Sequence, residues 1–386
     1  MPGPTYTALT TFGATLVDSA VRQLWPDDTI TRLTPVPSLN SLLYRVDVED
    51  RRLVAKVPVM GVPVATALRG TYGPLEQLQS RMRAHLATTA PPTHAQHTHL
   101  KHLTAAGLPA AGAAGYARGV LFTPASPDTE PLADLLREEP CRATDLLPRA
   151  LAAVAPVSGG ALPPVTAPGC QITNRLLHGL SAQSTWRYHL QRTDRIPTST
   201  LATIEPVITA SMRTLIPLVR ELPGRPVLTF GALQPDHLLY DDTRDQLTLL
   251  SPALQWSNPY ADLARLISRT TLLILTDSPA TAVGRKYVLT ALAHLLDDQA
   301  ARQSPERGAQ MLRAVLALWA ADTAHHLVSI LSTPSDLPLG VTDSAVATHC
   351  RLMCTLLHRV TTAAALDPPH PQAAWHDLFA TLNTLH

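Results

Sequence analysis

An adjacent acid and base, Asp236 and His237, lie in a polar stretch between short apolar runs. Such a pair can act as a general base near neutral pH, because histidine titrates close to that range. The alternative is turn chemistry, in which Pro235 and Asp236 start a turn and His237 packs beneath it. The residues alone leave both interpretations open.

Lys56 is one of only three lysines in the chain and lies in the apolar run 52–59. An amine in that setting could bind a phosphate or another anion. It could equally be a strand lysine with no ligand. Because nearly all other basic residues are arginine, we treat Lys56 as a candidate site residue.

Two further groups contain metal-ligand side chains. On one helix, Cys350, Cys354 and His358 share a face but span ~12 Å, so they cannot all reach one zinc ion, and we expect the cysteines to pack in the core. The second group lies in a stretch that we expect to be exposed. We predict no metal site from either group, whose members are His349, Cys350, Cys354 and His358, and His94, His97, His99 and His102.

The elements that would position these residues fall into two sets. The pattern of apolar residues in the first half of the sequence predicts helices and a hairpin whose second strand carries Lys56. Its segments are 11–24, 42–48, 52–59, 75–86, 97–106 and 119–123. After a linker near residue 126 the pattern is helical, except for short strands within 226–256. The later helices are expected at 260–277, 284–299, 308–332 and 343–365.

The composition excludes several classes of protein. With 386 residues, 45% hydrophobic and 16% charged, the chain can form two domains or one bilobal unit and is not disordered. A net charge of +1 and 4% aromatic residues indicate no nucleic-acid partner. We find no signal peptide or membrane span, so we expect a cytoplasmic protein without a membrane partner.

The order of these parts resembles the aminoglycoside and choline kinase-like phosphotransferase family. Four stretches carry the resemblance, and the last is the most specific. They are LYRVDVEDRRLVAKV, HLKHLTAAGLP, GVLFTPA followed by EPLADLL, and TFGALQPDHLLYDD followed by SPALQWSNPYADLARL. The resemblance implies an α+β, bilobal, protein-kinase-like fold, with a small antiparallel-sheet N-lobe and a large, mostly helical C-lobe.

In that fold we expect three regions along the chain. Residues 1–26 would form an N-terminal helical extension and residues 27–125 the degenerate nucleotide-binding N-lobe. Residues 126–386 would form the C-lobe, with a degenerate catalytic loop at 228–262. Lys56 falls on the family's nucleotide-binding lysine, and Asp262 matches an aspartate whose role is mainly structural.

The sequence departs from the family where phosphotransfer needs it most. The general-base aspartate falls on Ala232, and the metal-binding asparagine falls on His237, an imidazole that is a poor Mg²⁺ ligand. The metal-binding carboxylates are replaced within Ser251-Pro252-Ala253. The glutamate partner of the lysine falls on Gln96, unless Glu76 substitutes for it.

We therefore expect no conventional Mg-ATP phosphotransfer and no cofactor. Degenerate members of the family are encoded beside a kinase and a lyase that dehydrate precursor peptides, which implies a precursor-peptide partner. The predicted function is thioether ring closure, in which a cysteine thiolate adds to a dehydroamino acid, with activity as a peptide cyclase left open. The alternatives are a non-catalytic pseudokinase scaffold for that kinase or lyase, and an active small-molecule phosphotransferase.

The candidate residues follow from this interpretation. His237, Asp236 and Lys56 would supply the base and the donor for the developing enolate. Residues expected to contact the peptide are Tyr44, Asn40, Gln234, Ser251 and Trp256.

Overall fold

The computed structural model describes residues 4–39, 41–58, 80, 92–126, 128–160, 162, 190–276, 282–335, 337–366 and 371–384. These residues belong to two compact units. Unit 1 consists of Met1–Asp128, Ser184–Arg195 and Ser329–Ser344, and unit 2 consists of Thr129–Gln183, Ile196–Val328 and Ala345–His386. Each unit is described separately below.

Unit 1 contains an antiparallel sheet in the order β1-β2-β3-β5-β4. Its strands are β1 (Ile30–Val36), β2 (Leu42–Val48), β3 (Arg51–Val57), β4 (Gly115–Ala117) and β5 (Val120–Pro124). β2 and β3 form the expected hairpin, in which Val48 pairs with Arg51 across a tight turn. Glu49 has a φ of 49° in that turn, a left-handed conformation that the short connection requires.

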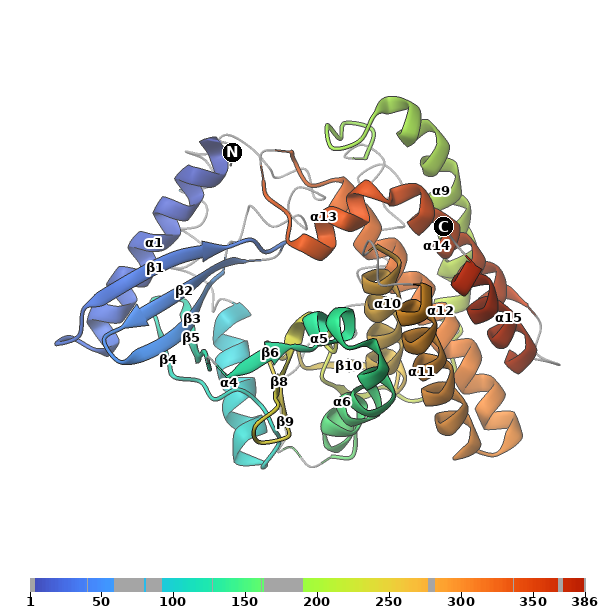
Figure 1. Ribbon diagram of the computed structural model, residues 1–386, viewed down its shortest axis with the longest axis horizontal. Helices are drawn as coiled ribbons and strands as arrows, with labels where there is room; N and C mark the ends of the chain where they lie inside the picture. The colour runs from blue at the N-terminus through green and yellow to red at the C-terminus, as the bar shows by residue number, and fades with distance from the viewer. Residues whose placement is uncertain are drawn as a thin grey trace. The chain divides into compact units, whose positions relative to one another are not determined.

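Helix α1 (Pro4–Leu24) packs on one face of this sheet (Figure 1). Alternate strand residues such as Val46, Ala55 and Phe122 point toward it and form a buried core with Leu9 and Val17. Because side chains alternate along a strand, the intervening residues lie on the opposite face. Leu121, on that opposite face of β5, is buried, and α4 (Pro92–Ala105) packs against the same strand.

Two segments from later in the chain belong to unit 1. The Arg195 guanidinium donates hydrogen bonds to the carbonyl oxygens of Thr333, Pro334 and Leu337. Leu337 joins the core that α1 shares with the sheet. The N-terminal sheet is therefore completed by residues almost three hundred positions away in the sequence.

Unit 2 begins with a three-stranded sheet in the order β6-β8-β9 and a two-stranded sheet of β10 and β7. These strands are β6 (Thr129–Pro131), β7 (Val227–Thr229), β8 (Leu238–Asp241), β9 (Gln246–Leu249) and β10 (Gln255–Ser257). Two short 3-10 turns, η1 (Pro140–Arg142) and η2 (Pro235–His237), accompany them. The short strands expected within 226–256 are thus confirmed.

Helices make up the rest of the described part of unit 2. They are α5 (Leu132–Glu138), α6 (Ala143–Ser158), α9 (Thr198–Arg220), α10 (Ala261–Thr276), α11 (Ala282–Ala301), α12 (Pro305–Leu331), α13 (Val341–Thr348), α14 (Cys350–Ala365) and α15 (Pro371–Thr384). The first residues of α13 and the last turn of α12 belong to unit 1. The helix expected over 343–365 is divided at His349, whose ψ of 27° departs from helical geometry.

Among the described residues, α12 alone is long and apolar enough to cross a membrane. Its most apolar stretch is 89% buried inside the protein. Trp319 on this helix packs against Trp375 and Phe379 of α15, with ring centroids 6.1 and 5.8 Å away. This burial is typical of the central helix of a folded core.

Candidate functional site

The candidate site is built on the loop between β7 and β8 in unit 2. The carboxylate of Asp262, in the first turn of α10, accepts hydrogen bonds from the backbone N–H groups of Phe230 and Gly231, both at 2.7 Å. Asp262 is buried, which raises the pKa of its carboxyl, while the two backbone donors and nearby Arg265 oppose that shift. The loop therefore has a fixed backbone even though Ala232 follows where a base is expected.

Gly231 is required by this geometry. Its φ is 73°, and a Cβ atom there would lie 2.2 Å from the carbonyl oxygen of Ala253. The Ala253 N–H in turn donates to the Phe230 carbonyl oxygen at 3.0 Å. The loop at 230–232 and the segment at 251–253 are thereby packed directly against each other.

His237 and Ala232 meet within this loop. The Nδ1 atom of His237 lies 3.0 Å from the Ala232 carbonyl oxygen. A carbonyl oxygen can only accept, so Nδ1 carries the proton, and in the neutral ring Nε2 is the proton acceptor. The backbone of His237 is held as well, because its N–H donates to Gln234 and its carbonyl oxygen accepts from Leu250, at 2.9 and 2.8 Å.

Ser251 has a strained backbone for a non-glycine residue, with a φ of 50°. Such a conformation costs on the order of 1 kcal/mol and is most often adopted by glycine, asparagine or aspartate. The side chain of Ser251 is partly exposed, as is that of Ala253. Positions 232, 251 and 253 are occupied by alanine, serine and alanine, so none of them supplies a carboxylate.

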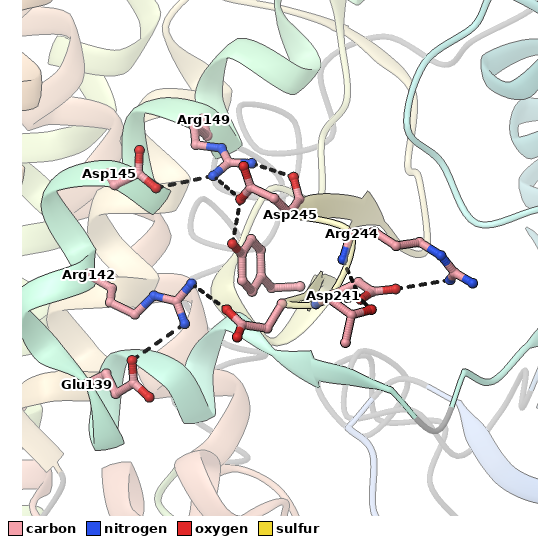
Figure 2. Close-up of polar contacts among 10 residues, drawn as sticks. Glu139, Arg142, Asp145, Arg149, Asp241, Arg244 and Asp245 are labelled. Carbon is pink, nitrogen blue, oxygen red and sulfur yellow. Dashed lines mark hydrogen bonds and ion pairs between the residues drawn. The ribbon is translucent and has the colours of Figure 1, made fainter.

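The β8–β9 hairpin that follows the loop is anchored to η1 and α6 by a charged cluster (Figure 2). The Tyr240 hydroxyl donates to the Asp245 carboxylate at 2.5 Å, and Arg149 donates to the same carboxylate at 2.7 Å. Arg142 lies over the Tyr240 ring, 4.7 Å from its centroid, and binds Asp242 at 3.0 Å. This cluster explains why the strand after His237 keeps its position.

Lys56 lies on β3 in unit 1, where it pairs in register with Leu43 and Leu121. Burial among apolar neighbours lowers the pKa of its amine to about 8. A substantial fraction of the amine is therefore neutral just above physiological pH. Glu76, the substitute partner considered from the sequence, lies outside the described residues.

The expected peptide-contacting residues have different positions. Tyr44 pairs with Ala55 and faces α1, so it lies on the opposite side of the sheet from Lys56. Its side chain is buried and its hydroxyl donates to the Thr10 carbonyl oxygen at 2.7 Å, so we leave Tyr44 out of the proposed site. Asn40 lies outside the described residues.

The other peptide-contacting candidates, Gln234, Ser251 and Trp256, lie in unit 2, as does the catalytic candidate Asp236. Gln234 is partly buried, and its side-chain oxygen is 3.4 Å from Arg265. The Trp256 side chain is 43% exposed on β10, opposite Leu228 of β7, and Asp236 is exposed at the tip of η2. Lys56 belongs to the other unit.

The metal-ligand clusters are not assembled. Cys350 and Cys354 are buried, as expected for core residues, whereas His349 and His358 are exposed. On α4, the rings of His94 and His97 pack against Tyr116, with centroids 5.4 and 5.2 Å away. Among the residues that the structure describes, no three His, Cys, Asp or Glu side chains are placed to share a metal ion.

Sequence analysis missed Arg265. It lies one turn after Asp262 on α10 and donates to the Gly231 carbonyl oxygen at 2.8 Å. The available signal was the spacing of an acid and a base by three residues at the start of a helix, which places both on one face. A sheet that carries Lys56, followed by helices and a loop held by Asp262, has the order of elements that the resemblance implies.

Comparison with solved structures confirms this fold. The chain is similar to a microcompartment-associated aminopropanol kinase, with a TM-score of 0.53, 12% identity, and coverage of 92% of this chain and 99% of that one. It is also similar to the apo form of a thermostable mutant of aminoglycoside phosphotransferase APH(4)-Ia, with a TM-score of 0.51, 14% identity, and coverage of 89% and 98%.

A choline kinase, LicA from Streptococcus pneumoniae, is similar over 89% of this chain and 99% of its own, with 11% identity and a TM-score of 0.48. No family model and no curated protein matches the sequence. At these identities the similarity establishes the fold alone. The chain thus has an aminoglycoside phosphotransferase-like fold.

Proposed function

We propose that this protein uses a phosphotransferase fold without Mg-ATP phosphotransfer, binding a precursor peptide and promoting thioether ring closure. The observation that carries the proposal is the contact between His237 and Ala232. The loop keeps a fixed backbone, but it presents an oriented imidazole and no carboxylate at the base and metal positions. Residues of these types favour proton transfer over binding of a magnesium ion.

The reaction needs neither an oxidant nor a nucleotide. His237 Nε2 accepts the proton of a cysteine thiol, and the thiolate sulfur forms a bond to the β-carbon of a dehydroamino acid. The electron pair of the carbon–carbon double bond moves toward the neighbouring carbonyl, giving an enolate. The proton that His237 accepted is then delivered to the α-carbon, which completes the thioether and regenerates the base. No atom is gained or lost by the peptide.

A histidine side chain suits this role, because an unprotonated imidazole nitrogen can take a proton from a thiol. Asp236 stays a candidate partner of His237 in proton transfer, and its side chain is exposed beside that residue. Trp256 offers an exposed aromatic surface on β10 for an apolar side chain of the peptide. The donor role of Lys56, which belongs to unit 1, stays a prediction from the sequence.

The test uses a peptide with one dehydroalanine and one cysteine separated by a short spacer. Ring closure does not change mass, so loss of reactivity toward N-ethylmaleimide, measured by mass spectrometry, reports it. We expect closure faster than in buffer, and a roughly hundredfold loss in His237→Gln, the lower range for a general base. His294→Gln changes an exposed histidine of α11 and should keep the wild-type rate. A wild-type rate equal to buffer overturns the proposal.

A scaffold for a partner kinase or lyase is the second candidate. It is favoured by the internal bonding of the loop, in which Asp262, Arg265 and His237 all bind neighbouring loop atoms. A scaffold should bind its partner equally well after His237→Gln, whereas a cyclase should lose rate without unfolding. Calorimetric titration with ATP and Mg²⁺ tests the third alternative, since clear binding would revive small-molecule phosphotransfer.

A further inference from the structure

Two neighbouring side chains near the start of α10 bind the backbone of one loop residue. The first accepts a hydrogen bond from it and the second donates one to it. Asp262 accepts from the Gly231 N–H at 2.7 Å, and Arg265 donates to the Gly231 carbonyl oxygen at 2.8 Å. Arg265 also lies 3.4 Å from the side-chain oxygen of Gln234. The first turn of α10 therefore fixes the loop on both sides of Ala232.

Ala232 carries the carbonyl group that orients the His237 ring. The peptide plane between residues 231 and 232 is set at one end by the bond from Arg265 to Gly231. The carbonyl oxygen of Ala232, one peptide further along, then lies 3.0 Å from His237 Nδ1. The backbone bonds of His237 to Gln234 and Leu250 place its Cα atom but leave the ring torsions undetermined.

We infer that Arg265 is a positioning residue for His237. By holding Gly231 and Gln234, it keeps the Ala232 carbonyl oxygen directed at Nδ1, and this fixes the tautomer in which Nε2 is the acceptor. This inference rests on the proposed function at one point, because the proposed reaction uses His237. The arrangement of the loop itself is independent of any substrate.

The geometry of arginine suits this task better than a single ammonium group would. Its planar guanidinium presents several N–H donors in fixed directions, so one side chain can reach a backbone oxygen and a side-chain oxygen together. Arg269, one turn later on α10, provides a matched comparison. It donates to Asp322 at 2.7 and 3.1 Å, and none of its described hydrogen bonds reaches the loop.

The experiment is side-chain nitrogen NMR of the full chain labelled with ¹⁵N-histidine, with the His237 signal identified by its loss in His237→Gln. We expect the Nδ1–H tautomer in the wild type, a several-fold larger share of the other tautomer in Arg265→Met, and partial recovery in Arg265→Lys. Arg269→Lys should leave the tautomer unchanged even if stability falls. The signals of other histidines report whether each variant is folded.

The inference is overturned if folded Arg265→Met keeps the wild-type tautomer, or if the wild type itself carries the proton on Nε2. If Arg265→Met does not fold, the comparison of Arg265→Lys with Arg269→Lys decides, since a shift in the first alone supports the inference and equal behaviour overturns it. A wild-type protein that has the expected tautomer but closes no thioether ring would overturn the proposed function and leave this inference standing.

Discussion

The His237 ring and the Ala232 carbonyl oxygen are hydrogen-bonded at 3.0 Å, although the resemblance to phosphotransferases assigns them two separate roles. Position 232 corresponds to the base aspartate and position 237 to the metal-binding asparagine. Here the two residues bind each other, and the loop is stabilised internally. The phosphotransferase-like fold is present, and the loss of phosphotransfer is part of the proposed function.

Nucleotide binding should appear only when several of the family's residues are introduced together. We expect Mg-ATP binding, measured by calorimetry, in the triple variant Ala232→Asp, His237→Asn, Ser251→Asp, and none in the wild type. Metal ions bound to phosphates need several hard oxygen ligands, so one carboxylate is insufficient. The left-handed backbone at position 251 accepts aspartate readily. Binding by the wild type or by Ala232→Asp alone that is as tight as that of the triple variant would contradict this.

Gly231→Ala should cost more stability than Gly107→Ala. The two glycines have almost the same left-handed backbone, with φ values of 73° and 75°. A Cβ atom at Gly107 meets nothing within 4 Å, whereas at Gly231 it would lie 2.2 Å from the Ala253 carbonyl oxygen. We expect about 1 kcal/mol of destabilisation at Gly107, from backbone strain alone, and clearly more at Gly231. Equal urea midpoints would show that the loop relaxes.

Lys56→Met should stabilise the protein most at neutral pH. The folded pKa of Lys56 is about 8, below that of an unfolded lysine, so the unfolded state binds more protons between about pH 8 and 10.4. The free energy of unfolding of the wild type is therefore reduced below pH 8, and this loss disappears as the pH rises toward 10.4.

The expected gain of Lys56→Met is about 1–3 kcal/mol at pH 7 and should fade by pH 10.5, measured as urea unfolding at several pH values. Lys101→Met, which changes an exposed lysine of α4, is the control and should show no such profile. A gain that does not change with pH would show that the pKa of Lys56 is not lowered in the folded protein.

Breaking the ion pair between α10 and α12 should strongly destabilise unit 2. Arg269 and Asp322 are 10% and 5% exposed and form two hydrogen bonds. Removing one partner leaves a buried charge, so we expect Arg269→Met to cost about 3–5 kcal/mol. The double variant Arg269→Met, Asp322→Leu should cost less, because no unpaired charge is left. Arg22→Met, at an exposed pair with Asp18, should cost about 0.5 kcal/mol or less.

The ion pair of Arg269 and Asp322 also predicts that the protein loses stability in acid. Burial by itself raises the pKa of Asp322, but the charges of Arg269 and Arg265 and the hydrogen bonds from Arg269 hold it well below its ordinary value. A carboxyl with a lowered folded pKa stabilises the protein above about pH 4, and this stability is lost as the pH falls below that. Asp322→Asn should therefore flatten the stability profile between about pH 4 and 2, measured by thermal unfolding.

Much of the fold could be predicted from local pattern. The hairpin that carries Lys56, the short strands around His237 and the long later helices follow from the spacing of apolar residues and from turn chemistry, which are properties of neighbouring residues. The departures at Ala232, His237 and Ser251 are likewise visible in the residue types. No contact between distant segments is needed for these conclusions.

Other features depend on which distant segments meet. Tyr44 is a core residue because α1 covers the face of β2 on which it lies. Arg265 binds the loop because α10 packs against that loop. The Ala232 carbonyl oxygen decides the tautomer of His237. The sequence by itself determined the elements and the residue types of the loop, because those depend on residue identity and local spacing. The tertiary structure decided which side chains are structural and how the remaining base is oriented, because burial and hydrogen bonds between distant residues exist only in the folded chain.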